Sequence, residues 1–286
     1  MNIAITGASG FLGTRLRERL VEAGNAVRVV PRMSLESSVP DDSLASADAV
    51  VHLAGESVAQ RWSEAAKKRI HDSRVEGTRH LVKALSAQSP RPRVLVCASA
   101  VGYYGSRGDQ ILTEASSPGT DFLARVVVDW EEAAQSAEAL DIRVVRLRFG
   151  MVLGHGGALA KLLPPFRFGV GGRLGSGHQW MAWIHIEDAV NLILFAANYA
   201  AIRGAVNATA PHPVTNEEFT DRLALALHRP AILPVPAFAL KLAFGEMSEM
   251  VLASQRVLPT VAKSAGFRFQ YQELHPALEN LLSAST

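Results

Sequence analysis

The chain has 286 residues, of which 48% are hydrophobic and 20% charged, and its formal net charge at pH 7 is +2. This composition is typical of a folded globular protein, and the length allows one large α/β domain with a modest appendage. Because the charges are spread and lysine and arginine form no run longer than three residues, we expect neither nucleic acid nor a membrane as partner.

The single cysteine, Cys97, excludes an intramolecular disulfide and is typical of a reducing compartment. Its apolar neighbours Leu95 and Val96 predict a small core residue rather than a nucleophile. The first predicted strand begins at residue 2, and no apolar run reaches the roughly 18 residues that a membrane span needs. We therefore expect the protein to be cytoplasmic.

The first thirty residues carry the pattern of a strand, a turn, a helix and a second strand. Residues 2–6 form an apolar run, and Leu12, Leu16 and Leu20 then recur one helical turn apart before Gly24. A second apolar run follows at residues 27–30. This order predicts a βαβ unit with a right-handed crossover.

Strands and helices continue to alternate along the first half of the chain. The sequence predicts strands over residues 49–53, 94–98 and 142–147, and helices over residues 75–85 and 122–140. Such alternation predicts an α/β fold, a Rossmann-type doubly wound parallel sheet covered by helices on both faces. The short stretch between Arg32 and Asp48 leaves little room for the usual third strand.

The second half of the chain predicts a smaller lobe and a C-terminal appendage. From about residue 154 the pattern changes to loops rich in glycine and proline, followed by a helix over residues 187–199. We assign this lobe to a Rossmann-type domain over residues 1–239, and we expect a small helical C-terminal domain over residues 240–286.

The turn after the first strand carries glycines at positions 7, 10 and 13. Glycine lets the backbone approach a pyrophosphate closely, and the N-terminus of the next helix offers unpaired N–H groups. The strand before this turn and the helix after it therefore predict a dinucleotide site. The expected cofactor-binding residues are Gly7, Ser9, Gly10, Phe11, Leu12, Gly13, Arg32, Leu53, Ala54, Gly55, Glu56, Ala98 and Ser99.

The end of the second predicted strand favours NADP(H) over NAD(H). A carboxylate at this place would pair with the ribose 2′-hydroxyl of NAD, whereas an arginine would pair with the 2′-phosphate of NADP. The sequence has Arg32 there and no acidic residue, and Arg15 on the first helix could assist. The alternative is that Arg32 is a solvated loop charge.

Short motifs outside the glycine turn extend over nearly the whole chain. They are Leu53-Ala54-Gly55-Glu56, Arg61-Trp62, Ser73-Arg74, residues 99–105, Trp130-Glu131, Trp183-Ile184-His185-Ile186 and residues 254–259. With these motifs the chain resembles the atypical extended short-chain dehydrogenase/reductases, in particular the epimerase-family group labelled nucleoside-diphosphate-sugar epimerases. This resemblance implies an NADP(H)-binding fold with a small C-terminal domain.

The resemblance also shows what this chain lacks. Members of the wider family use a catalytic serine and a Tyr-x-x-x-Lys pair, in which the lysine and the cofactor lower the pKa of the tyrosine. The corresponding positions here are Ala100, Leu123 and Val127. Met151 and Met181 stand where sugar-nucleotide epimerases place an asparagine and an arginine, and a thioether cannot neutralise a diphosphate.

Other residues are therefore candidates for proton transfer. Ser99, Tyr103 and Tyr104 lie on the loop after a central strand, where α/β proteins bind ligands, with Glu56 and His185 in reserve. Structural roles compete with each assignment: Tyr104 could be an aromatic wall, Ser99 a backbone partner, Glu56 a helix cap and His185 a hydrogen-bonded core residue.

Two functions remain open from the sequence. One is an NADP(H)-dependent oxidoreductase or epimerase-like enzyme with a small-molecule substrate, which the retained aromatic loop favours. The other is a non-catalytic NADP(H)-binding regulatory protein, which the missing tyrosine and lysine favour. No Cys, His or carboxylate cluster has metal-ligand spacing, so we predict no metal site.

Overall fold

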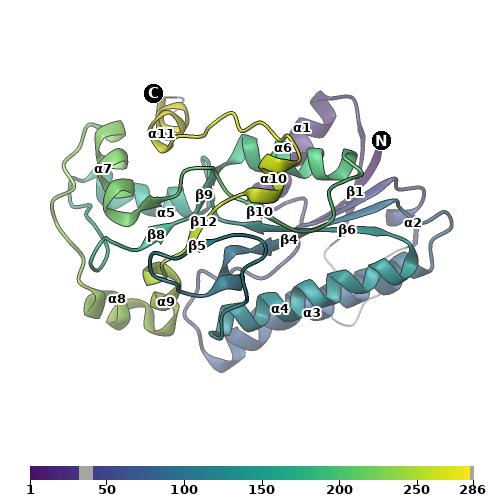
Figure 1. The fold of residues 1–286 in the computed structure, drawn as a ribbon, viewed down its shortest axis with the longest axis horizontal. Helices are drawn as coiled ribbons and strands as arrows, with labels where there is room; N and C mark the ends of the chain where they lie inside the picture. Colours follow the sequence, from purple (N-terminus) through teal and green to yellow (C-terminus); the bar gives the residue numbers. More distant parts are fainter. Residues whose placement is uncertain (32–40, 284–286) are drawn as a thin grey trace.

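A six-stranded parallel sheet forms the centre of the molecule (Figure 1). The computed structural model describes residues 1–31 and 41–283. The strands lie in the order β2-β1-β3-β4-β6-β10, and every neighbouring pair is parallel. Their bounds are β1 Asn2–Thr6, β2 Ala26–Val30, β3 Ala49–His52, β4 Val94–Ala100, β6 Arg143–Phe149 and β10 Gly204–Ala208.

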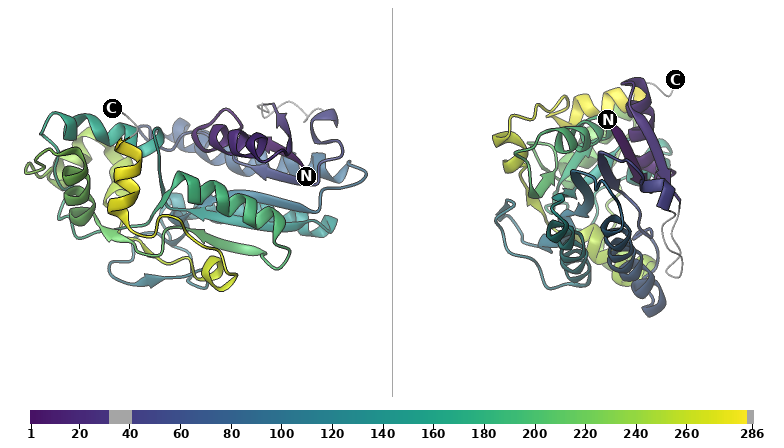
Figure 2. Two further views of the ribbon diagram at one scale, coloured as in Figure 1. Left: turned by 90° about the horizontal axis from the view of Figure 1, so that it is seen from above. Right: turned by 90° about the vertical axis from the view of Figure 1, so that its right-hand side faces the viewer.

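Helices cover both faces of this sheet (Figures 1 and 2). Successive side chains of a strand point to opposite faces. Ile3 and Ile5 pack with α1 and α6, whereas Ala4 and Val50 pack with α3 and α4, so two apolar cores enclose the sheet. The covering helices are α1 Phe11–Glu22 and α6 Ile186–Asn198 on one face, and α3 Glu64–Ser86 and α4 Phe122–Gln135 on the other.

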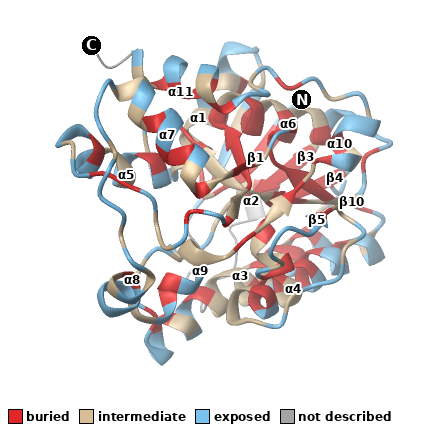
Figure 3. Cartoon of the chain, turned by 60° about the vertical axis from the view of Figure 1, so that its left-hand side comes forward, coloured by how far each residue is buried: buried red, intermediate tan, exposed pale blue. Residues whose placement is uncertain are grey.

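A second lobe lies at the end of the sheet away from the N-terminus (Figure 2). Its core joins side chains of α5, α7 and α11, including Leu159, Phe219 and Leu278. Figure 3 shows buried strands surrounded by helices with exposed outer faces. The lobe contains β7 Met151–Leu153, α5 Gly157–Arg167, β8 Trp180–Met181, β9 Trp183–His185, β11 Val214–Thr215, α7 Asn216–Leu227 and α11 Leu274–Ser283. Between α7 and α11 the chain forms α8 Ala237–Phe244, α9 Ser248–Leu252, β12 Arg256–Val257 and α10 Thr260–Ser264, and α10 packs against the core of the central sheet.

The Rossmann-type sheet is confirmed, and the strands predicted from the sequence occur within a few residues of their predicted bounds. Helix α3 begins at Glu64, well before the predicted start at residue 75, and the predicted helix over 122–140 continues beyond α4 as a 3₁₀ helix, η2 Ser136–Leu140. In the described part of residues 32–48 we find only the short helix α2 Asp41–Leu44. The described sheet therefore ends at β2.

Candidate functional site

The glycine turn lies at the switch point of the sheet, where the chain leaves β1 toward β2 and later returns to the opposite side as β3. Open α/β sheets bind ligands at this place, beyond the carboxyl ends of the strands. The backbones meet closely, since Leu53 N–H donates to the Thr6 carbonyl over 3.2 Å. A Cβ on Gly7 would lie 2.7 Å from Ala54 N, and Gly7 has a φ of +69°.

The three glycines have different physical roles. Gly7 and Gly13 are required by packing, because a Cβ on Gly13 would lie 2.2 Å from the Gly7 carbonyl oxygen. Gly10 has an ordinary φ of −75°, and its Cβ would meet only that carbonyl, at 3.2 Å. Gly10 therefore leaves space at the N-terminus of α1, whose first turn carries no acidic residue. A pyrophosphate fits this cradle.

Of the two arginines proposed for the 2′-phosphate, the structure describes only Arg15. Arg32 lies outside the described residues. Arg15 is committed to carboxylates: its Nε and Nη2 donate to Glu187 over 2.6 and 2.9 Å, and it also pairs with Glu18 and Glu22. Arg15 is thus already paired with three carboxylates, and its assisting role stays a prediction.

Ser99 and Tyr104 belong to a buried hydrogen-bond network. Ser99 Oγ donates to Glu131 over 2.6 Å, and Arg148 binds the same carboxylate with two bonds of 2.7 and 2.8 Å. Arg148 also donates to the Tyr104 hydroxyl over 3.0 Å, which in turn donates to Asn207 over 2.6 Å. Burial raises the pKa of Tyr104. Both hydroxyls thus have structural partners.

Tyr103 is the member of this loop whose hydroxyl has no hydrogen-bond partner among the described residues. It lies on η1 Val101–Tyr104, half-buried, and its ring stacks under the Arg148 guanidinium at 3.4 Å. The network that occupies Ser99 and Tyr104 therefore holds Tyr103 against a cation without using its hydroxyl.

The positions of the usual tyrosine and lysine are apolar in structure as well as in sequence. Leu123 packs in a cluster with Trp62, Val126 and Met247, and Val127 is buried on α4. Met181 contacts the Asn216 side chain through its sulfur. None of these side chains can exchange a proton at neutral pH.

The reserve candidates have defined local roles. Glu56 does not cap α3, because Ser63 does so by accepting from Ala66 N–H, and Glu56 instead follows β3 and accepts a bond from Gln60. His185 caps α6, where its Nδ1 accepts from Glu187 N–H, and its ring stacks on Tyr271 at 3.8 Å. Burial lowers the pKa of His185 to about 4, so it is neutral at pH 7.

Two residues near the end of β3, Arg74 and His52, were not among the site residues expected from the sequence. Arg74 of α3 lies against Gly55, with its guanidinium carbon 3.3 Å from the place of a Cβ there. His52 is fully buried between the Thr6 and Thr78 hydroxyls, at 2.6 and 3.0 Å, and burial lowers its pKa to about 4. The Ser73-Arg74 motif pointed to Arg74, but the sequence could not show what Arg74 contacts, because those contacts depend on how the helices pack.

The C-terminal segment is part of the site. Gln255 donates to the carbonyls of Val101 and Gly105 over 3.0 and 3.2 Å, and Ser254 Oγ donates to the Gly108 carbonyl over 2.7 Å. β12 also pairs with β5 Ile111–Leu112. This segment therefore clamps the loop that carries Tyr103.

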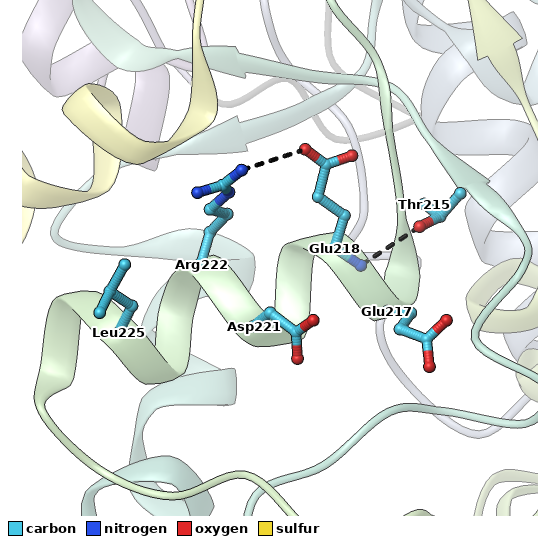
Figure 4. A pocket seen from close by; sticks show the side chains of 6 residues that line it. All are labelled: Thr215, Glu217, Glu218, Asp221, Arg222 and Leu225. Carbon is cyan, nitrogen blue, oxygen red and sulfur yellow. Dashed lines mark hydrogen bonds and ion pairs between the residues drawn. The ribbon is translucent and has the colours of Figure 1, made fainter.

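Two grooves lie elsewhere. One, of about 520 Å³, runs along α7 and is acidic, which does not suit a phosphate ligand (Figure 4). The other, of about 240 Å³, lies between α5 and α11. The groove on α7 is lined by Thr215, Glu217, Glu218, Asp221, Arg222 and Leu225. Within residues 1–31 and 41–283 no cluster of His, Cys, Asp and Glu could hold a metal ion.

A strand, a glycine turn and a helix at the switch point of a parallel sheet define a dinucleotide-binding protein of the Rossmann type. Residues 3–208 match the NAD dependent epimerase/dehydratase family, and the chain belongs to that family. Residues 235–281 match a domain of unknown function, DUF1731.

In the part of the chain that the structure describes, no helix is long and apolar enough to cross a membrane.

Relatives of this family cover nearly the whole chain. Epimerase family protein YfhF of Bacillus subtilis (strain 168) is 40% identical, over 99% of this chain and 98% of that protein. The epimerase family protein SDR39U1 homolog, chloroplastic, of Arabidopsis thaliana is 41% identical, over 99% and 87%. A crystal structure of human epimerase family protein SDR39U1 (isoform2) with NADPH is 33% identical, with a TM-score of 0.91 and 99% of both chains covered.

Proposed function

We propose that this chain binds NADP(H) across its glycine turn and transfers hydride to or from a small-molecule substrate in the cytoplasm. The observation that carries this proposal is the space at Gly10, where a Cβ would meet only the Gly7 carbonyl, beside the N-terminus of α1 and between two glycines that packing requires. The human relative with NADPH supports the choice of cofactor. The single, buried Cys97 suits a reducing compartment.

The residues of the chain have separable tasks in this proposal. Gly10 and the first turn of α1 hold the pyrophosphate, and Arg32 is our candidate for the 2′-phosphate from the sequence. NADP(H), when bound, supplies or accepts the hydride at its nicotinamide ring. Tyr103 is our candidate for the proton, because Ser99 and Tyr104 use their hydroxyls within the buried network.

The cofactor assignment is tested by calorimetric titration. We expect NADPH to bind at least about tenfold tighter than NADH, because an arginine pairs with the extra phosphate. Gly10→Val should abolish binding in a folded protein, since a branched side chain would fill the pyrophosphate space. Gly77→Val is the matched control, because nothing lies within 4 Å of its Cβ position. Full binding by folded Gly10→Val would refute the proposal.

A non-catalytic, NADP(H)-binding regulatory protein is the second candidate. It is favoured by Leu123 and Val127 at the usual catalytic positions and by the fully bonded Tyr104. A screen of aldehydes, ketones and quinones separates the two functions. NADPH binding without turnover of any of them would favour the regulatory function.

A further inference from the structure

Arg74 is a half-buried cation near the carboxyl end of β3. Its Nη1 donates to the backbone carbonyls of Glu56 and Ile70 over 2.9 and 3.1 Å. Among the described residues it forms no ion pair, and its Nε and Nη2 have no hydrogen-bond partner. A guanidinium carries five N–H donors, so most of its capacity is unused.

The half-buried guanidinium remains charged at neutral pH. Desolvation lowers the pKa of Arg74 to about 10, and the nearby Glu56 opposes this shift. The charge also contributes to the low pKa of His52, after the larger effect of burial. At neutral pH the end of β3 therefore carries a positive charge with which no carboxylate of the described residues forms an ion pair.

Arg74 contacts α4, the helix that would carry the missing lysine. Its guanidinium carbon lies 5.3 Å from the ring of Trp130, which follows Val127 by three residues on α4. Residues three apart on a helix are neighbours on its surface. Val127 cannot provide the positive charge of the family's lysine, but Arg74 of α3 provides one within a turn of that position on α4.

The order of the strands indicates which half of a bound cofactor would lie near Arg74. The 2′-phosphate is recognised beyond β2 and the pyrophosphate beyond β1, so the nicotinamide half must extend toward β3 and β4. Arg74 is pressed against Gly55, directly beyond β3. Its unused N–H groups are therefore on the nicotinamide side of the glycine turn.

We propose that Arg74 supplies the positive charge at the nicotinamide half of the bound cofactor, in place of the family's lysine. This inference rests on the proposed binding of NADP(H). A cation there donates to the hydroxyl or carboxamide oxygens of that half. It also favours the neutral ring of NADPH over the positively charged ring of NADP⁺, because like charges repel in a poorly solvated site.

The test measures binding rather than turnover. NADPH, NADP⁺ and 2′,5′-ADP, which lacks the nicotinamide half, are titrated into the wild-type protein, Arg74→Met and Arg74→Lys. We expect Arg74→Met to bind NADPH about tenfold more weakly and to lose preference for NADPH over NADP⁺, with 2′,5′-ADP changed by less than about twofold. Arg74→Lys should keep the preference. Arg79→Met, on the exposed face of α3, is the control.

The outcomes separate this inference from the proposed function. If Arg74→Met binds NADPH as the wild type does, or weakens all three ligands equally, Arg74 only supports the fold and the inference is wrong. The same follows if Arg74→Lys loses the preference for NADPH. If the wild-type protein binds none of the ligands, the proposed function itself fails, and this inference with it.

Discussion

At the scale of single residues, a buried ion pair organises the site. Glu131 accepts two hydrogen bonds from Arg148 and one from Ser99, so each charged group has a partner away from water. Such pairs contribute little net stability, but removing one partner leaves an uncompensated charge. The pair fixes the position of Tyr103, whose ring lies under Arg148.

Hydride transfer should depend on Tyr103 more than on its neighbours. Once a substrate is found, we expect Tyr103→Phe to lower the single-turnover rate about a hundredfold to ten-thousandfold, as loss of a general acid does. Ser99→Ala and Tyr104→Phe are compared with it. If all three variants, alone and combined, keep the wild-type rate, then the loop is not catalytic, and Glu56 and His185 become the next residues to replace.

His52 should make stability depend on pH. Burial lowers its pKa from 6.5 to about 4 in the folded protein, so the unfolded chain takes up a proton between these values while the folded protein does not. Stability contributed by neutral His52 is therefore complete above about pH 6.5 and falls as the pH falls toward 4. We expect a loss of roughly 2 kcal/mol from this residue between about pH 7.5 and about pH 5.

Urea unfolding of the wild type, His52→Gln and His178→Gln measures this effect. Glutamine can still bond to both threonine hydroxyls but does not titrate, so His52→Gln should show a smaller difference between the two pH values. The exposed His178 serves as the control. An equal difference in the wild type and His52→Gln would exclude His52 as the cause. His185, with a similarly low pKa, contributes to the remaining dependence in the same direction.

At the scale of elements, the sequence predicts those strands whose own residues form a recognisable pattern. β1 was predicted with its observed bounds because buried parallel strands are continuous apolar runs. The sequence does not predict β10 and β12: β10 begins at Gly204 and contains Asn207, and β12 has only two residues. Their strand character comes from pairing with β6 and β5, which no local pattern encodes.

The site divides in the same way. Gly7, Gly10 and Gly13 were predicted because the turn has a local physical requirement. The sequence could not predict that the Ser99 and Tyr104 hydroxyls are hydrogen-bonded whereas that of Tyr103 has no partner among the described residues. The partners of the two bonded hydroxyls come from α4 and β10, more than thirty residues away. Arg74 likewise obtains its surroundings from Trp130 on another helix.

A second glycine-rich segment encloses Phe11 at the start of α1. A Cβ on Gly154, Gly156 or Gly157 would lie 2.7 to 3.0 Å from the Phe11 ring. We expect Gly156→Ala to destabilise the protein by about 1–3 kcal/mol through overpacking. In the Phe11→Leu background the same change should cost less, because the smaller side chain leaves room. Denaturant unfolding of both single variants and the double variant gives the coupling, and additive effects would contradict the packing argument.

At the scale of the whole molecule, the C-terminal segment completes the structure around the loop after β4. Leu274, Leu278 and Leu281 of α11 are buried in the core shared with α5 and α7. Gln255 and Ser254 bind loop carbonyls directly. The region matched by DUF1731 therefore acts on the fold and on the candidate site together.

Gln255→Ala should loosen the loop without unfolding the protein. The change removes two hydrogen bonds, to Val101 and Gly105, each contributing about 1 kcal/mol, whereas β12 keeps its pairing with β5. We expect hydrogen exchange of residues 101–108 to become about tenfold faster, with the central strands unchanged. Gln270→Ala is the control, because among the described residues that exposed side chain bonds only to Tyr271. Unchanged exchange in Gln255→Ala would show that pairing of β12 alone holds the loop, and faster exchange throughout the protein would indicate general destabilisation instead.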